Sequence, residues 1–355
     1  MSGVSDVVAS RAEAAALDVP PLVVLEGLAP WVPGSGEISV RRIGDGHSNE
    51  TFRVDRGDGC WILRRPPRPP VPPSAHDVRR EHALLSALHA LGARVPRPVV
   101  LCDDERAIGA PFFLMELVDG VVVLDRLPPA FDDPAGCRAV CEQFVDGLVE
   151  LHAIDWRGSA LERIGRPHGY LERQLRRWQS QWEHNRTRPL PALEEVARRL
   201  AADPPVTRET TVVHGDYKLN NILFSTTAPV RRLATIDWEL ATLGDPLADL
   251  GFLLATYVAP GDVVDPVLGF SAATGGEGGL SRAQLVERYA AGSGRSVARA
   301  EWYECLALWK LAVLFEGSWK RHLAGTTVDP FFVLLEEGVP RLAERALALS
   351  DRGGV

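Results

Sequence analysis

Residues 212–239, which read VVHGDYKLNNILFSTTAPVRRLATIDWE, place four side chains capable of acid–base or metal chemistry between short apolar runs. His214, Asp216 and Asn221 lie in a polar segment that neither helical nor strand periodicity explains, and Asp237 ends a later apolar run. A buried polar group without a partner costs about 1–3 kcal/mol, so a fold does not normally gather several of them without a use. We therefore predict two strands whose ends bring these side chains close together.

The spacing of these residues is typical of a phosphoryl-transfer site. Asp216 and Asn221 are five positions apart, as in the kinase pattern H-x-D-x-x-x-x-N, and Asp237 stands where the metal-binding aspartate follows. We assign Asp216 to orient the attacking hydroxyl and take its proton, and Asn221 and Asp237 to hold Mg²⁺ through hard oxygen atoms. Lys218 is a candidate to stabilise the transferring phosphoryl group, and His214 is expected to brace the loop by hydrogen bonds.

The motifs HGDYKLNN and IDWELATLGDPLADLG resemble those of the aminoglycoside phosphotransferase superfamily, a set of small-molecule kinases with a kinase-like fold. The nearest branch includes the kinase-like domains fused to acyl-CoA dehydrogenases in animals, and SNETF and LRRPP add to the resemblance. It implies an α+β, bilobal protein-kinase-like fold. Residues 1–117 would form an N-terminal lobe with an antiparallel sheet, and residues 118–355 a mainly helical C-terminal lobe.

A Gly- and Ser-rich turn, IGDGHSNE, is expected to join two strands of the N-terminal lobe. Gly46 lets backbone N–H groups approach an anion, and Ser48 and Asn49 add side-chain donors. In the family that the sequence resembles, this turn covers the nucleotide phosphates. An ordinary hairpin turn is the alternative for this segment taken alone.

A cation on the strand at residues 61–65 is predicted to contact phosphate oxygens. Arg64 takes the position where kinases carry a lysine, and Arg65 is the fallback. Because neighbouring residues of a strand point to opposite faces, one of the two arginines is expected to be a surface cation.

The helix predicted for residues 75–91, with Ser74 as its N-cap, carries Glu81. Kinases place there the glutamate that pairs with the strand cation, so we expect an ion pair between Glu81 and Arg64. The apolar run that contains Glu116 and Leu117 corresponds in the family to the hinge that binds the nucleotide base. A buried strand is the alternative for this run, and both can hold.

The C-terminal lobe is predicted to be mostly helical. Asp245 is expected to cap a helix, and the resemblance implies that Asp249 in its first turn bonds back to the catalytic loop. Residues 261–279, rich in Gly and Ala, are predicted to form a mobile surface loop. Pro340 is expected to kink or split the helical stretch at residues 330–349.

Residues 170–188 combine two tryptophans with five arginines. Core packing for Trp178 and Trp182, and a solvated face for the arginines, are the expected roles. The alternative is that the arginines bind a carboxylate or the phosphates of an acyl-CoA.

Composition restricts the class of protein. The chain has 355 residues, 46% of them hydrophobic, which is ample for a core, and its formal net charge of −8 argues against a nucleic-acid surface. The five scattered cysteines suit reduced thiols, and neither a signal peptide nor an 18-residue apolar run is present. We expect a cytoplasmic protein, monomeric or homodimeric, with no nucleic-acid or membrane partner.

The sequence thus predicts Mg²⁺-dependent transfer of the γ-phosphoryl group of ATP or GTP to a hydroxyl of a small molecule. Within the family the acceptors include aminoglycosides, choline, sugars and, in the nearest branch, hydroxyacyl-CoA. Two alternatives stay open: a phosphotransferase acting on an aminoglycoside or another cationic alcohol, and a pseudokinase that binds nucleotide without turnover. The arginine at the usual lysine position motivates the second alternative.

Overall fold

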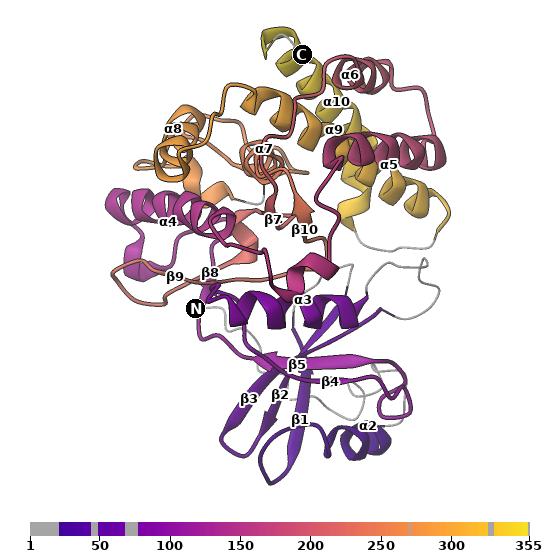
Figure 1. Cartoon of the computed structure of the whole chain (residues 1–355), viewed down its shortest axis with the longest axis vertical. Coiled ribbons are helices and arrows are strands. Elements are labelled where there is room, and N and C mark those ends of the chain that lie inside the picture. Colours follow the sequence, from indigo (N-terminus) through magenta and orange to yellow (C-terminus); the bar gives the residue numbers. More distant parts are fainter. Residues whose placement is uncertain (1–20, 44–48, 68–76, 270, 326–329, 354–355) are drawn as a thin grey trace. The chain divides into compact units, whose positions relative to one another are not determined.

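The computed structural model describes residues 21–43, 49–67, 77–269, 271–325 and 330–353. The chain divides into two compact units, Met1–Asp119 and Gly120–Val355 (Figure 1). Residues 44–48, at the tip of the Gly-rich turn, lie outside the described residues.

The N-terminal unit contains a five-stranded antiparallel sheet of order β1-β2-β3-β5-β4 (Figure 1). Alternating apolar residues, which a strand directs to one face, build its core with Phe52, Val54 and Leu63 almost fully buried. Helix α3 packs on β4 and β5. The elements of this unit are α2 (Pro21–Leu28), β1 (Ile38–Arg42), β2 (Glu50–Arg56), β3 (Gly59–Arg65), α3 (Val78–Ala90), β4 (Pro98–Cys102) and β5 (Phe112–Glu116).

Helix α3 begins three residues later than the sequence predicts. Asp77, and not Ser74, is its N-cap, because the Asp77 carboxylate accepts hydrogen bonds from the backbone N–H groups of Arg79 at 3.0 Å and Arg80 at 3.3 Å. Ser74 itself lies outside the described residues. At the other end, Gly92 adopts a φ of +79°, and the helix stops there as expected.

The C-terminal unit is organised around the long helix α9. This helix is apolar on most of its circumference, as a buried helix must be, and it packs against α5, α6, α7 and α10, while α4 packs against α8 (Figure 1). The helices are α4 (Pro134–His152), α5 (Tyr170–Asn185), α6 (Pro191–Ala202), α7 (Leu247–Thr256), α8 (Arg282–Ser293), α9 (Ala300–Leu323) and α10 (Leu335–Gly353).

Two small antiparallel sheets lie within this helical unit. The first pairs β7 with β10, and the second has the order β6-β8-β9. The strands are β6 (Val121–Val122), β7 (Thr211–Val213), β8 (Ile222–Phe224), β9 (Arg232–Thr235) and β10 (Thr242–Gly244). The strands predicted on either side of the HGDYKLNN segment are therefore confirmed.

The segment at residues 261–279 is not simply the surface loop that its composition suggests. Val267 and Thr274 are fully buried, and a short 3₁₀ helix, η5 (Ala272–Gly275), lies within it. Helix α7 leaves carbonyl groups unpaired at its C-terminal end, and this segment supplies donors for that region. The hydroxyl of Ser271 donates to the Thr256 carbonyl at 3.1 Å, and that of Thr274 to the Val258 carbonyl at 2.8 Å.

Pro340 does not split the last helix, because α10 continues through it. A proline has no N–H, so the Glu336 carbonyl loses its helical partner. Arg188 replaces that partner by donating to the Glu336 carbonyl at 2.6 Å and to the Leu335 carbonyl at 3.1 Å. Its guanidinium also pairs with the fully buried Glu316 carboxylate at 3.2 Å.

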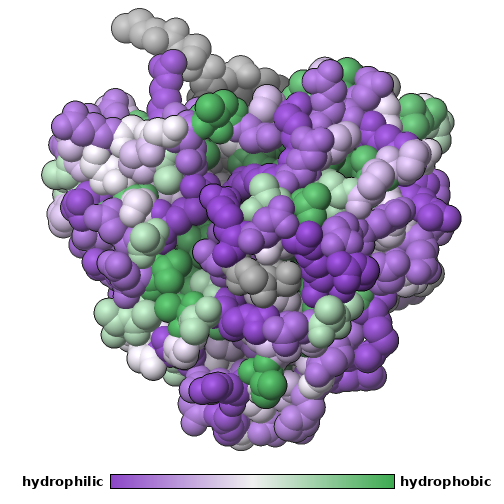
Figure 2. Space-filling model, turned by 90° about the horizontal axis from the view of Figure 1, so that it is seen from above, coloured by the Kyte–Doolittle hydropathy of each residue, from purple (hydrophilic) through white to green (hydrophobic). Residues whose placement is uncertain are grey.

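Hydrophilic residues predominate on the face shown in Figure 2, where hydrophobic residues form only small groups. In the described part of the chain, no helix combines the length and the apolar character needed to cross a bilayer. All five cysteines are free thiols, as predicted.

The Arg188→Met variant is expected to lower the free energy of unfolding by about 2 kcal/mol, because two carbonyls and a buried carboxylate lose a charged donor. In a Pro340→Ala background the cost should fall by about 1 kcal/mol, because the alanine N–H can take over the Glu336 carbonyl. Urea unfolding of the four proteins of this double-mutant cycle measures the coupling. Arg198→Met, at an exposed ion pair with Glu195, is the matched control. Strict additivity would contradict the proposed role of Arg188.

Candidate active site

The loop from His214 to Asn221, here called the HGD loop, is held in place by a buried carboxylate. Asp249, in the first turn of α7, accepts hydrogen bonds from the backbone N–H groups of His214 at 2.6 Å and Gly215 at 2.8 Å. Gly215 has a φ of +84°, and a Cβ there would lie 2.9 Å from the Leu240 carbonyl oxygen, so only glycine fits. The expected bond from Asp249 back to this loop is confirmed.

His214 connects the HGD loop to the end of β9. Its Nε2 lies 3.0 Å from the Ile236 carbonyl oxygen, and its Nδ1 accepts a hydrogen bond from the Asp216 N–H at 3.2 Å. The ring is fully buried and lies against the Trp238 indole. Both ring nitrogens are occupied by backbone groups, which confirms that His214 braces the loop.

The two oxygens of the Asp216 carboxylate have different surroundings. Oδ2 accepts a hydrogen bond from Asn221 Nδ2 at 2.9 Å and lies 2.9 Å from Lys218 Nζ. Oδ1 accepts no hydrogen bond from the residues that the structure describes. Asp216 thus has one oxygen fixed by two donors and the other available to a ligand.

Asn221 and Asp237 are brought together by the pairing of β8 and β9. Asn221 uses Nδ2 to donate to the Asp216 backbone and side chain, which leaves Oδ1 as its remaining side-chain acceptor. The Ile236 N–H donates to the Asn221 carbonyl at 2.9 Å, which places the Asp237 backbone beside Asn221. Among the described residues other than glycine, Asp237 alone has a positive φ, of +65°, a conformation that concentrates at functional sites.

These two residues offer an amide oxygen and a carboxylate oxygen, the hard ligands that suit Mg²⁺. No group of three His, Cys, Asp or Glu side chains that could hold a metal occurs among the described residues. Mg²⁺ is commonly held by one or two protein ligands together with substrate phosphates and water. The donor set of Asn221 and Asp237 fits such a site.

In the N-terminal unit, the predicted ion pair between Arg64 and Glu81 is confirmed. Arg64 Nε lies 3.3 Å from Glu81 Oε2, and the two side chains are 8% and 1% exposed. Asn49 Nδ2 donates to the same Glu81 oxygen at 3.1 Å. Glu81 therefore connects the strand cation with the end of the Gly-rich turn. Gly46 and Ser48 lie outside the described residues.

Arg65 is not the surface cation that alternation along the strand predicts. Arg64 and Arg65 are both buried, at 6% and 3% exposure, because the central strand β3 is covered on both faces at this end. Arg65 Nε pairs with Glu50 Oε2 at 3.2 Å. The sequence analysis did not single out Glu50, although a lone acidic residue at the start of an apolar strand was a usable signal.

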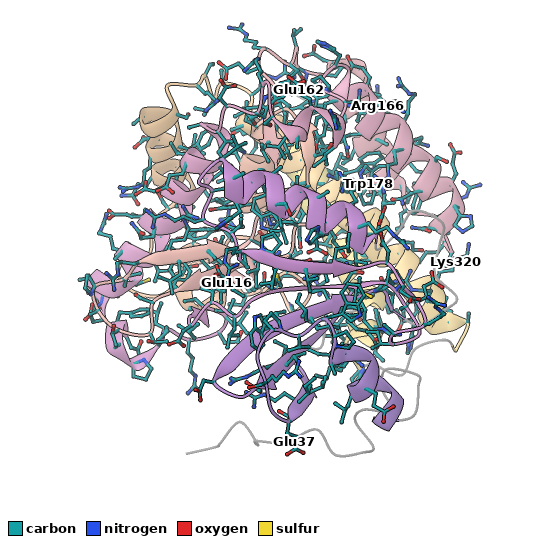
Figure 3. All side chains as sticks on the ribbon, turned by 60° about the horizontal axis from the view of Figure 1, so that its bottom comes forward. Glu37, Glu116, Glu162, Arg166, Trp178 and Lys320 are labelled. Atoms are coloured by element: carbon teal, nitrogen blue, oxygen red, sulfur yellow. The ribbon has the colours of Figure 1, made fainter. Side chains whose placement is uncertain are left out.

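Glu116 and Leu117 lie at the end of β5, and both are partly buried. Glu116 Oε1 accepts a hydrogen bond from the Arg97 N–H at 3.0 Å, so its side chain supports the neighbouring strand (Figure 3). The hinge role predicted for these two residues stays a prediction.

Asp245 lies one residue before the position predicted for it, since Pro246 occupies the N-cap of α7. Its carboxylate still accepts a hydrogen bond from the Leu247 N–H at 3.0 Å, and the Tyr303 hydroxyl donates to it at 2.8 Å. Burial raises the pKa of Asp245.

His152 contacts the Asp249 carboxylate that anchors the HGD loop. It is fully buried, with Nδ1 at 2.7 Å from the Tyr289 hydroxyl and Nε2 at 3.4 Å from Asp249 Oδ2. Burial lowers the pKa of His152, although the Asp249 carboxylate opposes this effect. His152 therefore supports the carboxylate that anchors the HGD loop.

The sequence profile of the phosphotransferase enzyme family matches residues 39–303. Acyl-CoA dehydrogenase family member 11 of Gallus gallus is 33% identical over 324 residues, which cover 90% of this chain and 41% of that protein. The chain therefore spans less than half the length of this curated relative.

Two crystal structures have a similar fold. That of a Ralstonia eutropha protein assigned as an aminoglycoside phosphotransferase aligns with a TM-score of 0.76 at 27% identity, over 93% of this chain and 98% of that one. Spectinomycin phosphotransferase, in complex with ADP and spectinomycin, aligns with a TM-score of 0.60 at 11% identity, over 91% of this chain and 97% of that one. The predicted kinase-like α+β fold is confirmed.

Replacing Asp249 by asparagine is expected to leave either the His214 or the Gly215 N–H without its acceptor, because an amide offers one oxygen where the carboxylate offers two. We expect a loss of about 1–3 kcal/mol in the free energy of unfolding and faster hydrogen exchange at the Gly215 amide. Asp155→Asn, at an exposed aspartate, is the control. Unchanged exchange at Gly215 would contradict the anchoring role.

Stability is expected to fall as the pH drops below the ordinary histidine pKa of 6.5. The folded protein holds His152 with a lowered pKa, so the unfolded chain binds a proton that the folded chain does not, and unfolding becomes easier in acid. Each such proton contributes up to about 1.4 kcal/mol per pH unit. Urea unfolding between pH 7.5 and 5.5 measures the slope, and His152→Gln should reduce it. Equal slopes in the two proteins would contradict this account.

Proposed function

This chain belongs to the phosphotransferase enzyme family, and on that premise we propose that it transfers the γ-phosphoryl group of ATP or GTP to a hydroxyl group of a small molecule. The observation that carries the proposal is the asymmetry of Asp216. Lys218 and Asn221 hold Oδ2, whereas Oδ1 has no donor among the described residues. That oxygen is suited to an acceptor hydroxyl.

The transfer step follows from this arrangement. The acceptor hydroxyl donates a hydrogen bond to Asp216 Oδ1, and its oxygen attacks the γ-phosphorus. As the new O–P bond forms, the bond to the β–γ bridging oxygen breaks and the hydroxyl proton moves to Asp216, which later releases it to water. The products are a phosphate monoester and a nucleoside diphosphate. Lys218, already fixed beside Asp216, adds positive charge near the transferring group.

The residues assigned to the donor nucleotide belong to the N-terminal unit. Arg64, oriented by Glu81, is assigned to the phosphate oxygens, and Asn49 is held by the same glutamate. Gly46 and Ser48 belong to the same predicted phosphate site, and Glu116 and Leu117 to the base site. The ADP complex of spectinomycin phosphotransferase supports a nucleotide donor for this fold.

Mg²⁺ would be held by Asn221 Oδ1 and the Asp237 carboxylate, and when bound it supplies charge neutralisation for the phosphates. The positive φ of Asp237 and the Ile236–Asn221 backbone hydrogen bond preorganise these two oxygen donors.

A hydroxyacyl-CoA is the acceptor that we favour. The similarity to acyl-CoA dehydrogenase family member 11 extends over 90% of this chain, and the dehydrogenase name of that protein concerns acyl-CoA chemistry. The arginine-rich helix α5 also suits an anionic acceptor. An aminoglycoside is the second candidate, which the spectinomycin complex of a structural neighbour supports.

The Asp216→Asn variant is expected to bind nucleotide almost as tightly as the wild type and to lose about 10²- to 10⁴-fold in kcat, because an amide cannot take the hydroxyl proton. Nucleotide consumption is measured with Mg²⁺ and a panel of hydroxyacyl-CoAs, hydroxy acids and aminoglycosides. Mass spectrometry of the phosphate monoester confirms the product.

Asp155→Asn serves as the activity control, since this exposed residue is not part of the site. Comparable turnover in Asp216→Asn and the wild type would refute the assigned role. Tight nucleotide binding by the wild type without turnover of any acceptor would instead favour the pseudokinase.

A further inference from the structure

Lysine is rare in this protein. Of 39 basic residues only three are lysines, namely Lys218, Lys310 and Lys320, and the others are arginines. Lys218 contacts Asp216 directly. Lys310 lies on α9, which packs against α7, and α7 carries the Asp249 that anchors the HGD loop. A lysine differs from an arginine in carrying a compact charge that responds strongly to its surroundings. Two of the three lysines are therefore associated with the proposed transfer site.

Lys310 lies on α9 in a setting that does not neutralise its charge. Its Nζ is 5.3 Å from the ring centroid of Trp178 on α5, so the indole face stabilises the ammonium group. The side chain is partly buried, yet no carboxylate of the described residues lies within ion-pair distance of it. A buried cation that serves only the fold is normally paired.

The charges around Lys310 leave it a cation at neutral pH. Burial lowers the pKa of Lys310 to about 8. The Asp249 and Asp216 carboxylates raise this pKa, and the Arg177 guanidinium lowers it further. Arg177, on the exposed side of α5, brings a second positive charge into the same region. The C-terminal unit therefore combines the Asp216 carboxylate, which can accept a hydroxyl proton, with a Lys310 ammonium group that forms no ion pair with the described residues.

We propose that Lys310 binds an anionic group, a carboxylate or a phosphate, of the acceptor whose hydroxyl meets Asp216. The inference rests on the proposed function and specifies the chemical class of its acceptor. The indole of Trp178 provides an apolar wall beside the ammonium group, and Arg177 adds long-range attraction. A neutral or cationic acceptor would leave the Lys310 charge uncompensated.

The experiment uses three acceptors that share one hydroxyacyl chain: the free hydroxycarboxylate, its coenzyme A thioester and its uncharged N-acetylcysteamine thioester. In Lys310→Met, kcat/KM for a charged acceptor should fall about 10- to 100-fold, mainly through KM, as expected for one charge-assisted hydrogen bond. The uncharged thioester and the nucleotide should keep their KM values. The charged acceptor that loses activity identifies a carboxylate or a phosphate as the bound group.

Two further variants separate binding from packing. Lys310→Arg retains the charge and should recover part of the lost activity. Lys320→Met is the matched control, because Lys320 lies near the end of the same helix and donates only to the His184 carbonyl among the described residues (Figure 3). Since Lys310→Met removes an uncompensated cation, its thermal midpoint should not fall below that of the wild type.

Equal losses for charged and uncharged acceptors, or no loss for either charged one, would overturn the inference. If the wild type phosphorylates none of the three, the favoured hydroxyacyl-CoA acceptor fails, and Lys310 is still tested by amine acylation followed by peptide mass spectrometry. With ADP and Mg²⁺ filling the donor site, added coenzyme A or the free hydroxycarboxylate should protect Lys310 and not Lys320. Absence of that protection would overturn the inference on its own.

Discussion

The site depends on one buried carboxylate, that of Asp249. It accepts two consecutive backbone N–H groups of the HGD loop, and the carboxylate is itself completely buried beside His152. Such a group is costly to bury unless its oxygens are bonded, so its hydrogen bonds fix the start of the loop in one position. From that point Gly215 turns the chain, and His214 connects it to the strand that ends at Asp237. The position of the HGD loop therefore depends on Asp249, a residue that is not assigned a role in phosphoryl transfer.

In the N-terminal unit, buried cations are likewise held in place by partners of opposite charge. Arg64 and Arg65 occupy adjacent positions of a central strand, and each is buried against a glutamate. Glu81 also accepts a hydrogen bond from Asn49, so the orientation of the guanidinium and the end of the Gly-rich turn are coupled. The pairing with Glu81 limits the rotamers that the Arg64 guanidinium can adopt. An arginine can therefore take the kinase lysine position without loss of the ion pair.

The pattern of apolar runs predicted the strands around the HGD loop, and the resemblance to kinases implied the Arg64–Glu81 pair and the anchoring role of Asp249. The sequence-based predictions were wrong at positions where contacts between residues distant in sequence determine the structure. Arg65 is buried because Glu50 reaches it from the neighbouring strand, and Pro340 is tolerated because Arg188 supplies the missing donor. Neither partner lies near in sequence, and no local pattern connects them. Lys310 was missed for the same reason, although the scarcity of lysine was visible in the sequence.

Two charged side chains, Asp216 and Lys310, differ from the groups that support the HGD loop. Hydrogen-bond partners satisfy the Asp249 carboxylate, both ring nitrogens of His214, and Asp216 Oδ2. Asp216 Oδ1 and the Lys310 ammonium group, in contrast, have no such partner among the described residues, and the two side chains interact electrostatically. An unpaired buried charge lowers the free energy of unfolding, so these two groups do not stabilise the fold. Their coincidence beside the HGD loop is best explained by a ligand with a hydroxyl for one and an anion for the other.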